Sequence, residues 1–180
     1  MENETEFRIL TADDINLYRE IRLDCLQNYP DYFGTLLQNE VKAKTLKFDN
    51  VLRQENSQSF LYGAFKKEEL IGICGFTRED RIKTNHRGEI NQMYVRNEFA
   101  GQGIGTQLLK FTLDKAFTDE KLELIELGVV NNNEKAIKIY SNFGFVQFGH
   151  LENYFKYDNK YWAFTFMVLT KENYFDKEQN

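Results

Sequence analysis

The first third of the chain carries apolar side chains at helical spacing. In "LTADDINLYREIRLDCL", apolar residues from Ile15 to Cys25 fall on one face of a helix, after Thr11 as an N-cap and Asp14 in the first turn. A looser apolar pattern from about Thr35 to Arg53 indicates one or two further helices. The N-terminal region is therefore predicted to be helical.

The pattern then changes to that of strands. The runs "SFLYGAF" and "LIGICGFT" are apolar and aromatic, and the charged residues "KKEE" between them are typical of a hairpin turn. After a polar loop, "GEINQMYV" alternates between two faces from Ile90 to Val95. Three consecutive strands are predicted here.

Helices and strands alternate in the second half of the chain. An apolar stripe from Leu108 to Ala116 predicts a helix, and "LELIELGVV" predicts the strand after it. A turn or N-cap at Asn131–Glu134 leads into "EKAIKIYSNFGF", a helix that Gly144 ends as a left-handed C-cap, with Phe145 in the accompanying hydrophobic contact.

The last segment predicts a closing hairpin. Its strands are "FVQFGHLENYFKY" and "KYWAFTFMVLT", joined by a turn at Asp158 and Asn159. The predicted order is helices, three strands, helix, strand, helix and two strands. With a length of 180 residues and no internal repeat, this order predicts one α+β (α/β) domain over residues 1–180.

Composition narrows the functions that the chain can have. Acidic and basic residues are interspersed at a net charge of −5, so no basic cluster predicts nucleic-acid binding. No apolar run reaches membrane-spanning length and no signal segment begins the chain, which favours a cytoplasmic protein with no membrane partner. Cys25 and Cys74 are interpreted as small buried hydrophobes. His86 and His150 lack ligand companions at useful spacing, so no metal is expected.

Three glycines at alternating positions precede the helix that contains Leu108. In "RNEFAGQGIGTQLLKF", Gly101, Gly103 and Gly105 lie between a strand and a helix, where backbone N–H groups at the positive end of a helix dipole bind phosphate. The same glycines also suit a simple tight turn. The spacing excludes a P-loop, because no lysine follows Gly105, and a dinucleotide fingerprint, because Thr106 stands where a third glycine is needed.

Two segments together resemble a known family. "MYVRNEFAGQGIGTQLLKFTL" and "LGVVNNNEKAIKIYSNFGF" are similar to the signature segments of the GNAT superfamily of N-acetyltransferases, which use acetyl-CoA. The resemblance implies the GNAT fold: a central, mixed, mostly antiparallel sheet of about six to seven strands flanked by helices. It also implies a splay between the strand ending at Val95 and the strand ending near Val130.

The resemblance assigns cofactor contacts within a core segment of about residues 88–145. It implies that the strand through Met93 contacts the acetyl group and pantetheine arm, that the glycine loop holds the pyrophosphate, that Asn133 contacts the arm and that Tyr140 lies near the CoA sulfur. The implied cofactor-binding residues are Met93, Tyr94, Val95, Gly101, Gln102, Gly103, Ile104, Gly105, Thr106, Asn133 and Tyr140. The family usually has Arg or Gln where Ala100 stands, which removes one side-chain contact but leaves the amides.

Acetyl transfer to an amine needs a base and an acid. Glu89 matches the catalytic glutamate of some GNAT enzymes and would take the proton of an ammonium group, whose pKa is about 10. A solvent-facing residue at the start of a strand is the alternative for Glu89. Tyr140 would protonate the departing thiolate, and its alternative is a core aromatic whose hydroxyl reaches a partner.

The acceptor is less well defined. In the family, the N-terminal helices (about 11–56), the loop at 78–87 and the hairpin at 150–161 form the acceptor groove. We expect direct attack by a primary amine of a small molecule in a ternary complex. Enzymes acting on ribosomal-protein N-termini tend to have a glutamate where Gly128 stands, which disfavours a peptide. A non-catalytic CoA-binding or sensing module and a protein N-terminal or lysine acetyltransferase remain alternatives, and family members often form homodimers.

Overall fold

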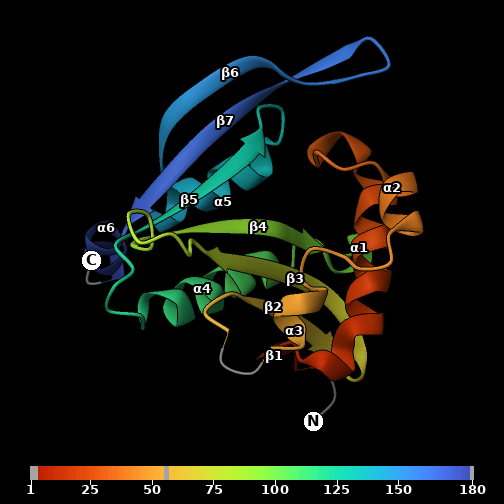
Figure 1. Ribbon diagram of the computed structural model, residues 1–180, viewed down its shortest axis with the longest axis horizontal. Helices are drawn as coiled ribbons and strands as arrows, with labels where there is room; N and C mark the ends of the chain where they lie inside the picture. Colours follow the sequence, from red (N-terminus) through yellow and green to blue (C-terminus); the bar gives the residue numbers. More distant parts are fainter. Residues whose placement is uncertain (1–3, 55–56, 179–180) are drawn as a thin grey trace. The chain divides into compact units, whose positions relative to one another are not determined.

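Seven strands form one mixed sheet in the order β1-β2-β3-β4-β5-β7-β6 (Figure 1). The structure is a computed structural model that describes residues 4–54 and 57–178. The strands are β1 (Glu6–Ile9), β2 (Phe60–Lys66), β3 (Glu69–Arg78), β4 (Arg87–Val95), β5 (Leu124–Val130), β6 (Val146–Tyr157) and β7 (Lys160–Thr170). This sheet confirms the predicted fold class.

Six α-helices and three short 3₁₀ segments accompany the strands of the described residues. The α-helices are α1 (Ile15–Asn28), α2 (Leu37–Lys42), α3 (Asp49–Leu52), α4 (Ile104–Phe117), α5 (Glu134–Phe143) and α6 (Lys171–Glu178). The 3₁₀ segments are η1 (Ala12–Asp14), η2 (Pro30–Tyr32) and η3 (Asn97–Phe99). None of the helices in the described ranges is long and apolar enough to cross a membrane.

The chain divides into two compact units. The first contains residues 1–30, 35–77 and 90–118, and the second contains residues 31–34, 78–89 and 119–180. Strand β4 passes through both, because its first three residues, Arg87–Glu89, belong to the second unit and Ile90–Val95 belong to the first.

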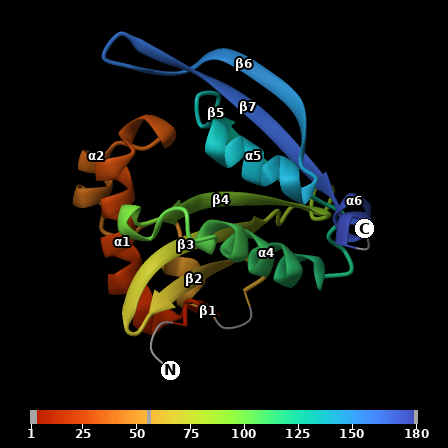
Figure 2. The same ribbon diagram turned by 180° about the vertical axis from the view of Figure 1, so that it is seen from behind.

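In the first unit, α1 and α4 cover opposite faces of the sheet (Figures 1 and 2). Strands β1, β2 and β3 pair in antiparallel fashion. The predicted stripe of α4 is the buried face of that helix, with Leu108, Leu109 and Thr112 fully inaccessible to solvent. Apolar side chains on both faces of β3 are buried as well, as expected for a strand with a helix on each side.

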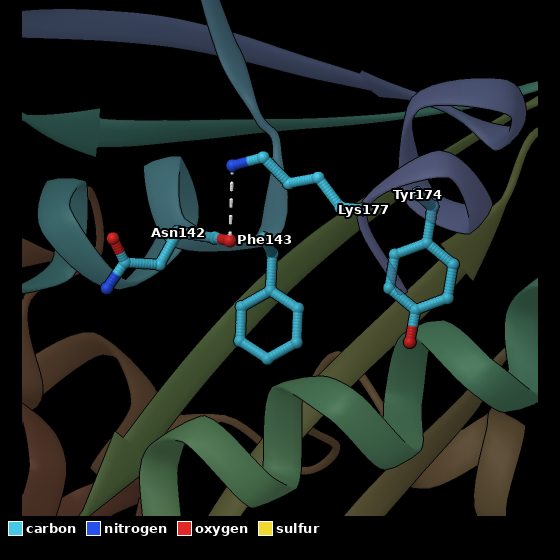
Figure 3. Close-up of a pocket in the computed structure, with 4 residues that line it drawn as sticks. All are labelled: Asn142, Phe143, Tyr174 and Lys177. Carbon is cyan, nitrogen blue, oxygen red and sulfur yellow. Dashed lines mark hydrogen bonds between the residues drawn. The ribbon is translucent and has the colours of Figure 1, made fainter. Parts of the chain in front are cut away.

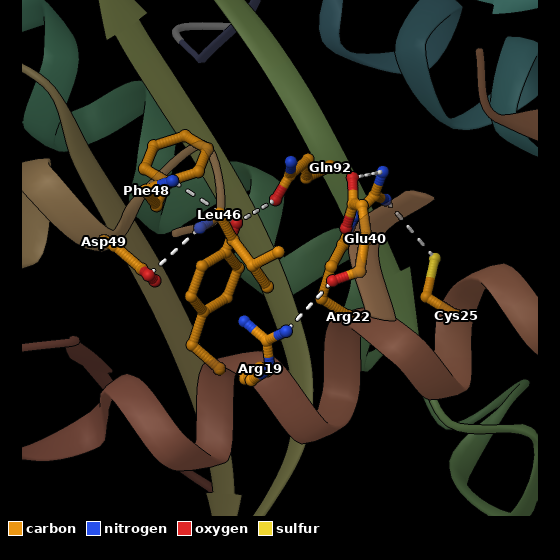
Figure 4. Close-up of polar contacts among 9 residues, drawn as sticks. Arg19, Arg22, Cys25, Glu40, Leu46, Phe48, Asp49 and Gln92 are labelled. Carbon is orange, nitrogen blue, oxygen red and sulfur yellow. Dashed lines mark hydrogen bonds and ion pairs between the residues drawn. The ribbon is translucent and has the colours of Figure 1, made fainter. Parts of the chain in front are cut away.

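Helix α1 also holds the segment that contains α2. The Arg22 guanidinium donates two hydrogen bonds to the Glu40 carboxylate, at 2.9 and 3.0 Å, and Arg19 donates to the carbonyl oxygens of Glu40, Val41 and Ala43 (Figure 4). Arg22 is 3% exposed, so this charge is compensated inside the unit by Glu40. The two short helices thereby confirm the looser pattern predicted for residues 35–53.

In the second unit, β7 pairs with β5 on one side and with β6 on the other, both antiparallel. Thr165, Met167 and Leu169 are buried, while the residues that alternate with them from Phe164 to Thr170 are half-buried. Helix α5 lies alongside β7 (Figure 2). Asp158 and Asn159 have φ of 47° and 59°, which confirms the predicted hairpin turn.

The start of β4 joins β5 as the parallel pair of the second unit. Its register runs from Arg87 opposite Leu124 to Glu89 opposite Glu126. The predicted splay requires this pairing to stop before the end of β4, and the register does end at Glu89.

Helix α5 ends in the predicted glycine cap. Gly144 has φ of 99°, its N–H donates to the Ser141 carbonyl at 3.0 Å, and the Phe145 N–H donates to the Tyr140 carbonyl at 3.1 Å. The Phe145 ring contacts the Tyr140 ring with centroids 5.8 Å apart. These are the two hydrogen bonds and the apolar contact of a Schellman motif.

Two elements are absent from the predicted order. No strand was predicted for "EFRI", but β1 pairs with β2 from Glu6–Phe65 to Ile9–Tyr62. The hairpin was predicted as the last element, but α6 follows β7 and has a low apolar content. Four residues of alternating polarity and a polar helix give weak periodicity, and tertiary contacts decide both elements.

The start of α1 carries a charged cap. Asp14 Oδ2 accepts from the Thr11 N–H at 2.8 Å, and the Asp14 carboxylate also accepts two hydrogen bonds from Arg8, at 2.7 and 2.8 Å. The Arg8 guanidinium, more than the backbone donor, lowers the pKa of Asp14 from its usual value. The carboxylate therefore stabilises the folded state in its charged form.

We expect the stabilising effect of Asp14 to depend on pH. Because the folded pKa is lowered, the difference in urea midpoint between wild type and Asp14→Asn is full above the ordinary pKa of about 3.9 and disappears as the pH falls through the folded value. Urea unfolding from about pH 7 to pH 2 measures this difference. Asp13→Asn removes the neighbouring exposed carboxylate and is the matched control, because Asp13 lacks the two hydrogen bonds that Arg8 donates to Asp14. A pH-independent difference for Asp14→Asn would contradict the assignment.

Candidate functional site

The C-terminal half of β4 is fixed to α1 by its side chains. Three residues at alternate positions, Gln92 and Tyr94 in the strand and Arg96 directly after it, each make a hydrogen bond to α1. The three contacts are Tyr18 Oη to Gln92 Oε1 (2.9 Å), Tyr94 Oη to Asp24 Oδ2 (2.7 Å) and Arg96 Nη2 to Glu20 Oε1 (2.7 Å). Met93, Tyr94 and Val95, the predicted contacts of the acetyl group and the arm, therefore lie in a segment that one helix holds over its whole length.

The Tyr94 side chain is buried and held by a hydrogen bond and a ring contact. Its side chain is 6% exposed, and its ring meets the Tyr29 ring edge-on with centroids 6.0 Å apart. Burial and the hydrogen bond to the Asp24 carboxylate raise the pKa of the Tyr94 phenol. The hydroxyl is thus a protonated donor, and the backbone of residue 94 is what the site can offer a ligand.

The other face of this strand meets the start of α4. A Cβ added at Gly105 would lie 3.3 Å from Met93 Cε and 3.6 Å from Val95 Cγ2. A glycine here lets the first turn of the helix approach the strand closely. The strand through Met93 and the glycine turn are therefore adjacent within the first unit.

The glycine turn has the backbone conformation that glycine permits. Gly101 and Gly103 have φ of 80° and 79°, and a Cβ on either would meet no other atom within 4 Å. Both positions are exposed. Glycine is required here for its backbone conformation, and space for a ligand remains above the turn.

Helix α4 begins directly after Gly103, which has no side-chain cap. The first bond of the helix is donated by the Gln107 N–H to the Gly103 carbonyl at 3.0 Å, so the N–H groups of residues 104–106 precede the helical ladder. Ile104 is 5% exposed and can offer a ligand only its backbone, whereas Gln102 and Thr106 are exposed. This arrangement of N–H groups at the positive end of a 14-residue helix suits an anion.

A lysine that the sequence did not predict lies near this turn. Lys66 Nζ lies 5.3 Å from the centroid of the Phe99 ring, which directly precedes Ala100. A cation is therefore present near the position where the family usually has Arg or Gln. Nothing in the local pattern of "AFKK" predicts this proximity, because Lys66 and Phe99 are distant in the sequence.

Asn133 and Tyr140 belong to α5 in the second unit. Asn133 is the N-cap, and its Oδ1 accepts from the Ala136 N–H at 3.2 Å, so the predicted cofactor contact is also a capping residue. Tyr140 is 7% exposed, and its ring packs on Phe145. The structure thus gives Tyr140 the core packing that was named as its alternative.

Glu89 also belongs to the second unit, at an exposed position of β4. Its Cα partner on β5 is Glu126, whose carboxylate accepts a hydrogen bond from Arg87. Two carboxylates and a guanidinium therefore occupy one face of these strands. Of the predicted residues, the first unit brings together Met93 to Val95 and Gly101 to Thr106, while Glu89, Asn133 and Tyr140 lie in the second.

A surface hollow in the second unit contains none of the predicted site residues. It is lined by Asn142, Phe143, Tyr174 and Lys177, where α5 meets α6 (Figure 3). Lys177 Nζ donates to the carbonyl oxygens of Ser141 and Asn142, at 3.0 and 3.3 Å. These bonds satisfy the last carbonyls of α5, so the hollow is explained by helix capping. Among the described residues, no group of three or more His, Cys, Asp and Glu side chains is placed to hold a metal.

The fold and the glycine turn define a known family. A model of the acetyltransferase (GNAT) family matches residues 16–145. The chain therefore belongs to this family.

Individual relatives match part of the chain. A spermidine N(1)-acetyltransferase of Vibrio cholerae is 31% identical over 113 residues, which are 63% of this chain and 64% of the relative. The corresponding Escherichia coli K12 protein is 33% identical over 49% of this chain and 47% of its own length. N-alpha-acetyltransferase 30 of Dictyostelium discoideum is 30% identical over 51% and 49%. The matches span about half to just under two thirds of these relatives.

Solved structures share the fold over nearly the whole chain. A GNAT-family acetyltransferase from Streptococcus pneumoniae superimposes with a TM-score of 0.81 at 21% identity, covering 93% of this chain and 99% of that one. A putative acetyltransferase from Salmonella typhimurium, solved with its cofactor acetyl-CoA, gives a TM-score of 0.76 at 17% identity over 93% and 94%. At these identities the likeness establishes the fold.

We expect Gly103→Ala to destabilise the protein through its backbone. A side chain at φ of 79° costs about 1 kcal/mol, although the added methyl group meets no atom within 4 Å. Urea unfolding measures the loss. Gln102→Ala, at the exposed neighbouring position, is the control and stays within about 0.5 kcal/mol of wild type. Equal stability of the two variants would show that the turn does not depend on the left-handed glycine.

Proposed function

We propose that this protein is an N-acetyltransferase that moves the acetyl group of acetyl-CoA to a primary amine of a small molecule. The observation that carries the proposal is the pair of left-handed glycines, Gly101 and Gly103, directly before an uncapped helix in a GNAT chain. A diphosphate would accept hydrogen bonds from the N–H groups of residues 101–106. The N–H groups of Met93 to Val95 would bind the arm and polarise the thioester oxygen.

Asn133 and Tyr140 of α5 have the remaining roles that the family resemblance implies. The Asn133 amide has NH₂ donors in addition to the Oδ1 that caps α5, so the same residue would cap the helix and donate to the pantetheine arm. Tyr140, near the end of the same helix, would provide a phenol for the CoA sulfur. Lys66 would add a positive charge on the side where the family's usual Arg or Gln is replaced by Ala100.

We propose direct attack in a ternary complex. Glu89, directly or through a water, would remove a proton from the ammonium group of the acceptor. The neutral nitrogen would then attack the thioester carbon, forming the C–N bond while the C–S bond breaks. Tyr140 would give its proton to the CoA thiolate. After the attack, the acetylated nitrogen would lose its surplus proton, which would return the Tyr140 phenolate to its protonated form. The products would be an N-acetylamine and CoA.

An aliphatic polyamine is the acceptor class that we propose first. Relatives in V. cholerae and E. coli are spermidine N(1)-acetyltransferases. The net charge of −5 favours a cationic acceptor over an anionic one. Glu89 and Glu126 on neighbouring strands would supply carboxylates to ammonium groups.

A second candidate is acetylation of protein N-termini. It is favoured by the match to N-alpha-acetyltransferase 30 of D. discoideum, which is 30% identical over 92 residues. A peptide acceptor would bind through its backbone as well as its amine, so a panel that includes both chemistries separates the two candidates.

The test is a thiol-release assay with acetyl-CoA and a panel containing spermidine, spermine, a monoamine, an aminoglycoside and short peptides with free N-termini. We expect turnover with a polyamine, and a kcat lower by about 100-fold in Glu89→Gln and by at least about tenfold in Tyr140→Phe. Glu120→Gln and Tyr174→Phe are the exposed and buried controls and keep the wild-type kcat.

Other outcomes have distinct meanings. Turnover with peptides alone would support the second candidate. CoA binding without turnover on any amine would favour a non-catalytic module, and no rise in melting temperature with acetyl-CoA would refute the whole proposal, because a ligand that binds the folded state must stabilise it.

A further inference from the structure

Gln92 has an unusual backbone conformation for its place in the fold. It lies in the middle of β4, one residue before Met93, and its φ is 52°. A positive φ is unfavourable for a residue with a side chain, and within a strand it interrupts the regular pleat. Such a conformation persists only when surrounding contacts enforce it.

Tyr18 provides a specific contact that enforces it. The Tyr18 hydroxyl donates to Gln92 Oε1 at 2.9 Å and accepts from the Phe48 N–H at 3.3 Å (Figure 4). Its side chain is inaccessible to solvent, and burial raises the pKa of the phenol to about 12. The hydroxyl therefore remains a protonated donor at neutral pH.

Phe48 makes the far end of this chain of hydrogen bonds rigid. Its ring is fully buried and meets the Tyr18 ring edge-on at 6.1 Å. A Cβ added at Gly75 would lie 2.4 Å from the Phe48 ring, so β3 has a glycine where this ring rests. The same Cβ would lie 2.9 Å from the Asn91 carbonyl oxygen, next to Gln92. Phe48, Tyr18 and Gln92 thus form one packed and hydrogen-bonded series.

We propose that Tyr18 and Gln92 are positioning residues that hold β4 in its left-handed conformation at residue 92 and so aim the N–H groups of Met93 to Val95 at acetyl-CoA. The inference rests on the proposed function. Neither residue touches the cofactor: Gln92 acts through the backbone of the next residues, and Tyr18 acts through Gln92. The series of Phe48, Tyr18 and Gln92 therefore sets the direction in which the N–H groups of Met93 to Val95 point.

A purely structural role predicts a change in stability without a change in CoA affinity. If the positive φ of Gln92 served folding alone, alanine would lower the urea midpoint more than glycine, but the folded variants would bind CoA equally. If the positive φ is what the site needs, glycine adopts it freely and alanine does not. The comparison of Gln92→Gly with Gln92→Ala therefore separates the two roles.

The experiment titrates the full-length protein with CoA by calorimetry. We expect Gln92→Ala and Tyr18→Phe each to weaken CoA binding by about tenfold, and Gln92→Gly to stay within about threefold of wild type. Tyr18→Phe added to Gln92→Gly should cost little more, because the hydroxyl has no amide left to hold. With turnover as a second readout, the alanine variant raises the KM for acetyl-CoA more than it lowers kcat.

Lys67 is the matched control. It has φ of 58° in the turn between β2 and β3, so Lys67→Ala and Lys67→Gly repeat the backbone comparison outside β4. These variants change the urea midpoint and leave CoA affinity unchanged.

Equal CoA affinity of Gln92→Ala and Gln92→Gly, whether reduced or at the wild-type level, would overturn the inference. A wild-type protein that binds no CoA would instead refute the proposed function. The Gln92 pair decides the question even if Tyr18→Phe fails to fold.

Discussion

The attachment of β4 to helix α1 is the constraint on which the first unit depends. Tyr18, Glu20 and Asp24 hold the strand and the residue that follows it at alternate positions, and the opposite face of the strand meets Gly105 at the start of α4. A strand end that is fixed on both faces can present its backbone groups in a defined direction. The glycine turn follows immediately, so both sets of N–H groups are positioned by the same packing.

The sequence predicted most of this framework because the framework follows local rules. Helical spacing, the N-cap at Thr11, the left-handed cap at Gly144 and the Asp158–Asn159 turn are each encoded within a few residues, and the structure confirms them. Strand β1 was missed because four residues carry little periodicity. Helix α6 was missed because its composition is polar, and it depends on contacts such as the Lys177 bonds to the end of α5.

The parts of the candidate site that consist of backbone groups were predictable from the sequence. The side-chain contacts that position those groups were less predictable. The three glycines predicted the turn, and the family resemblance named Asn133 as a cofactor contact. The pattern also predicted a turn or N-cap at Asn131–Glu134, and the structure shows that Asn133 is the capping residue. Gln92 did carry a signal, since it is the polar member of a strand face that otherwise presents Ile90 and Tyr94. The Gln92 side chain contacts a tyrosine 74 positions earlier in the sequence. This contact depends on the tertiary fold and cannot be predicted from the pattern of a single sequence.

The turn at Gly101 and Gly103 has one further consequence. A diphosphate held by peptide groups is held by donors that have no ionisation equilibrium near neutrality, unlike a site built from histidine or from a carboxylate network. A diphosphate also stays fully ionised over the physiological pH range, so the affinity of the proposed site for it would not change there. Acidification would affect the proposed acetylation step through the acceptor amine and its base.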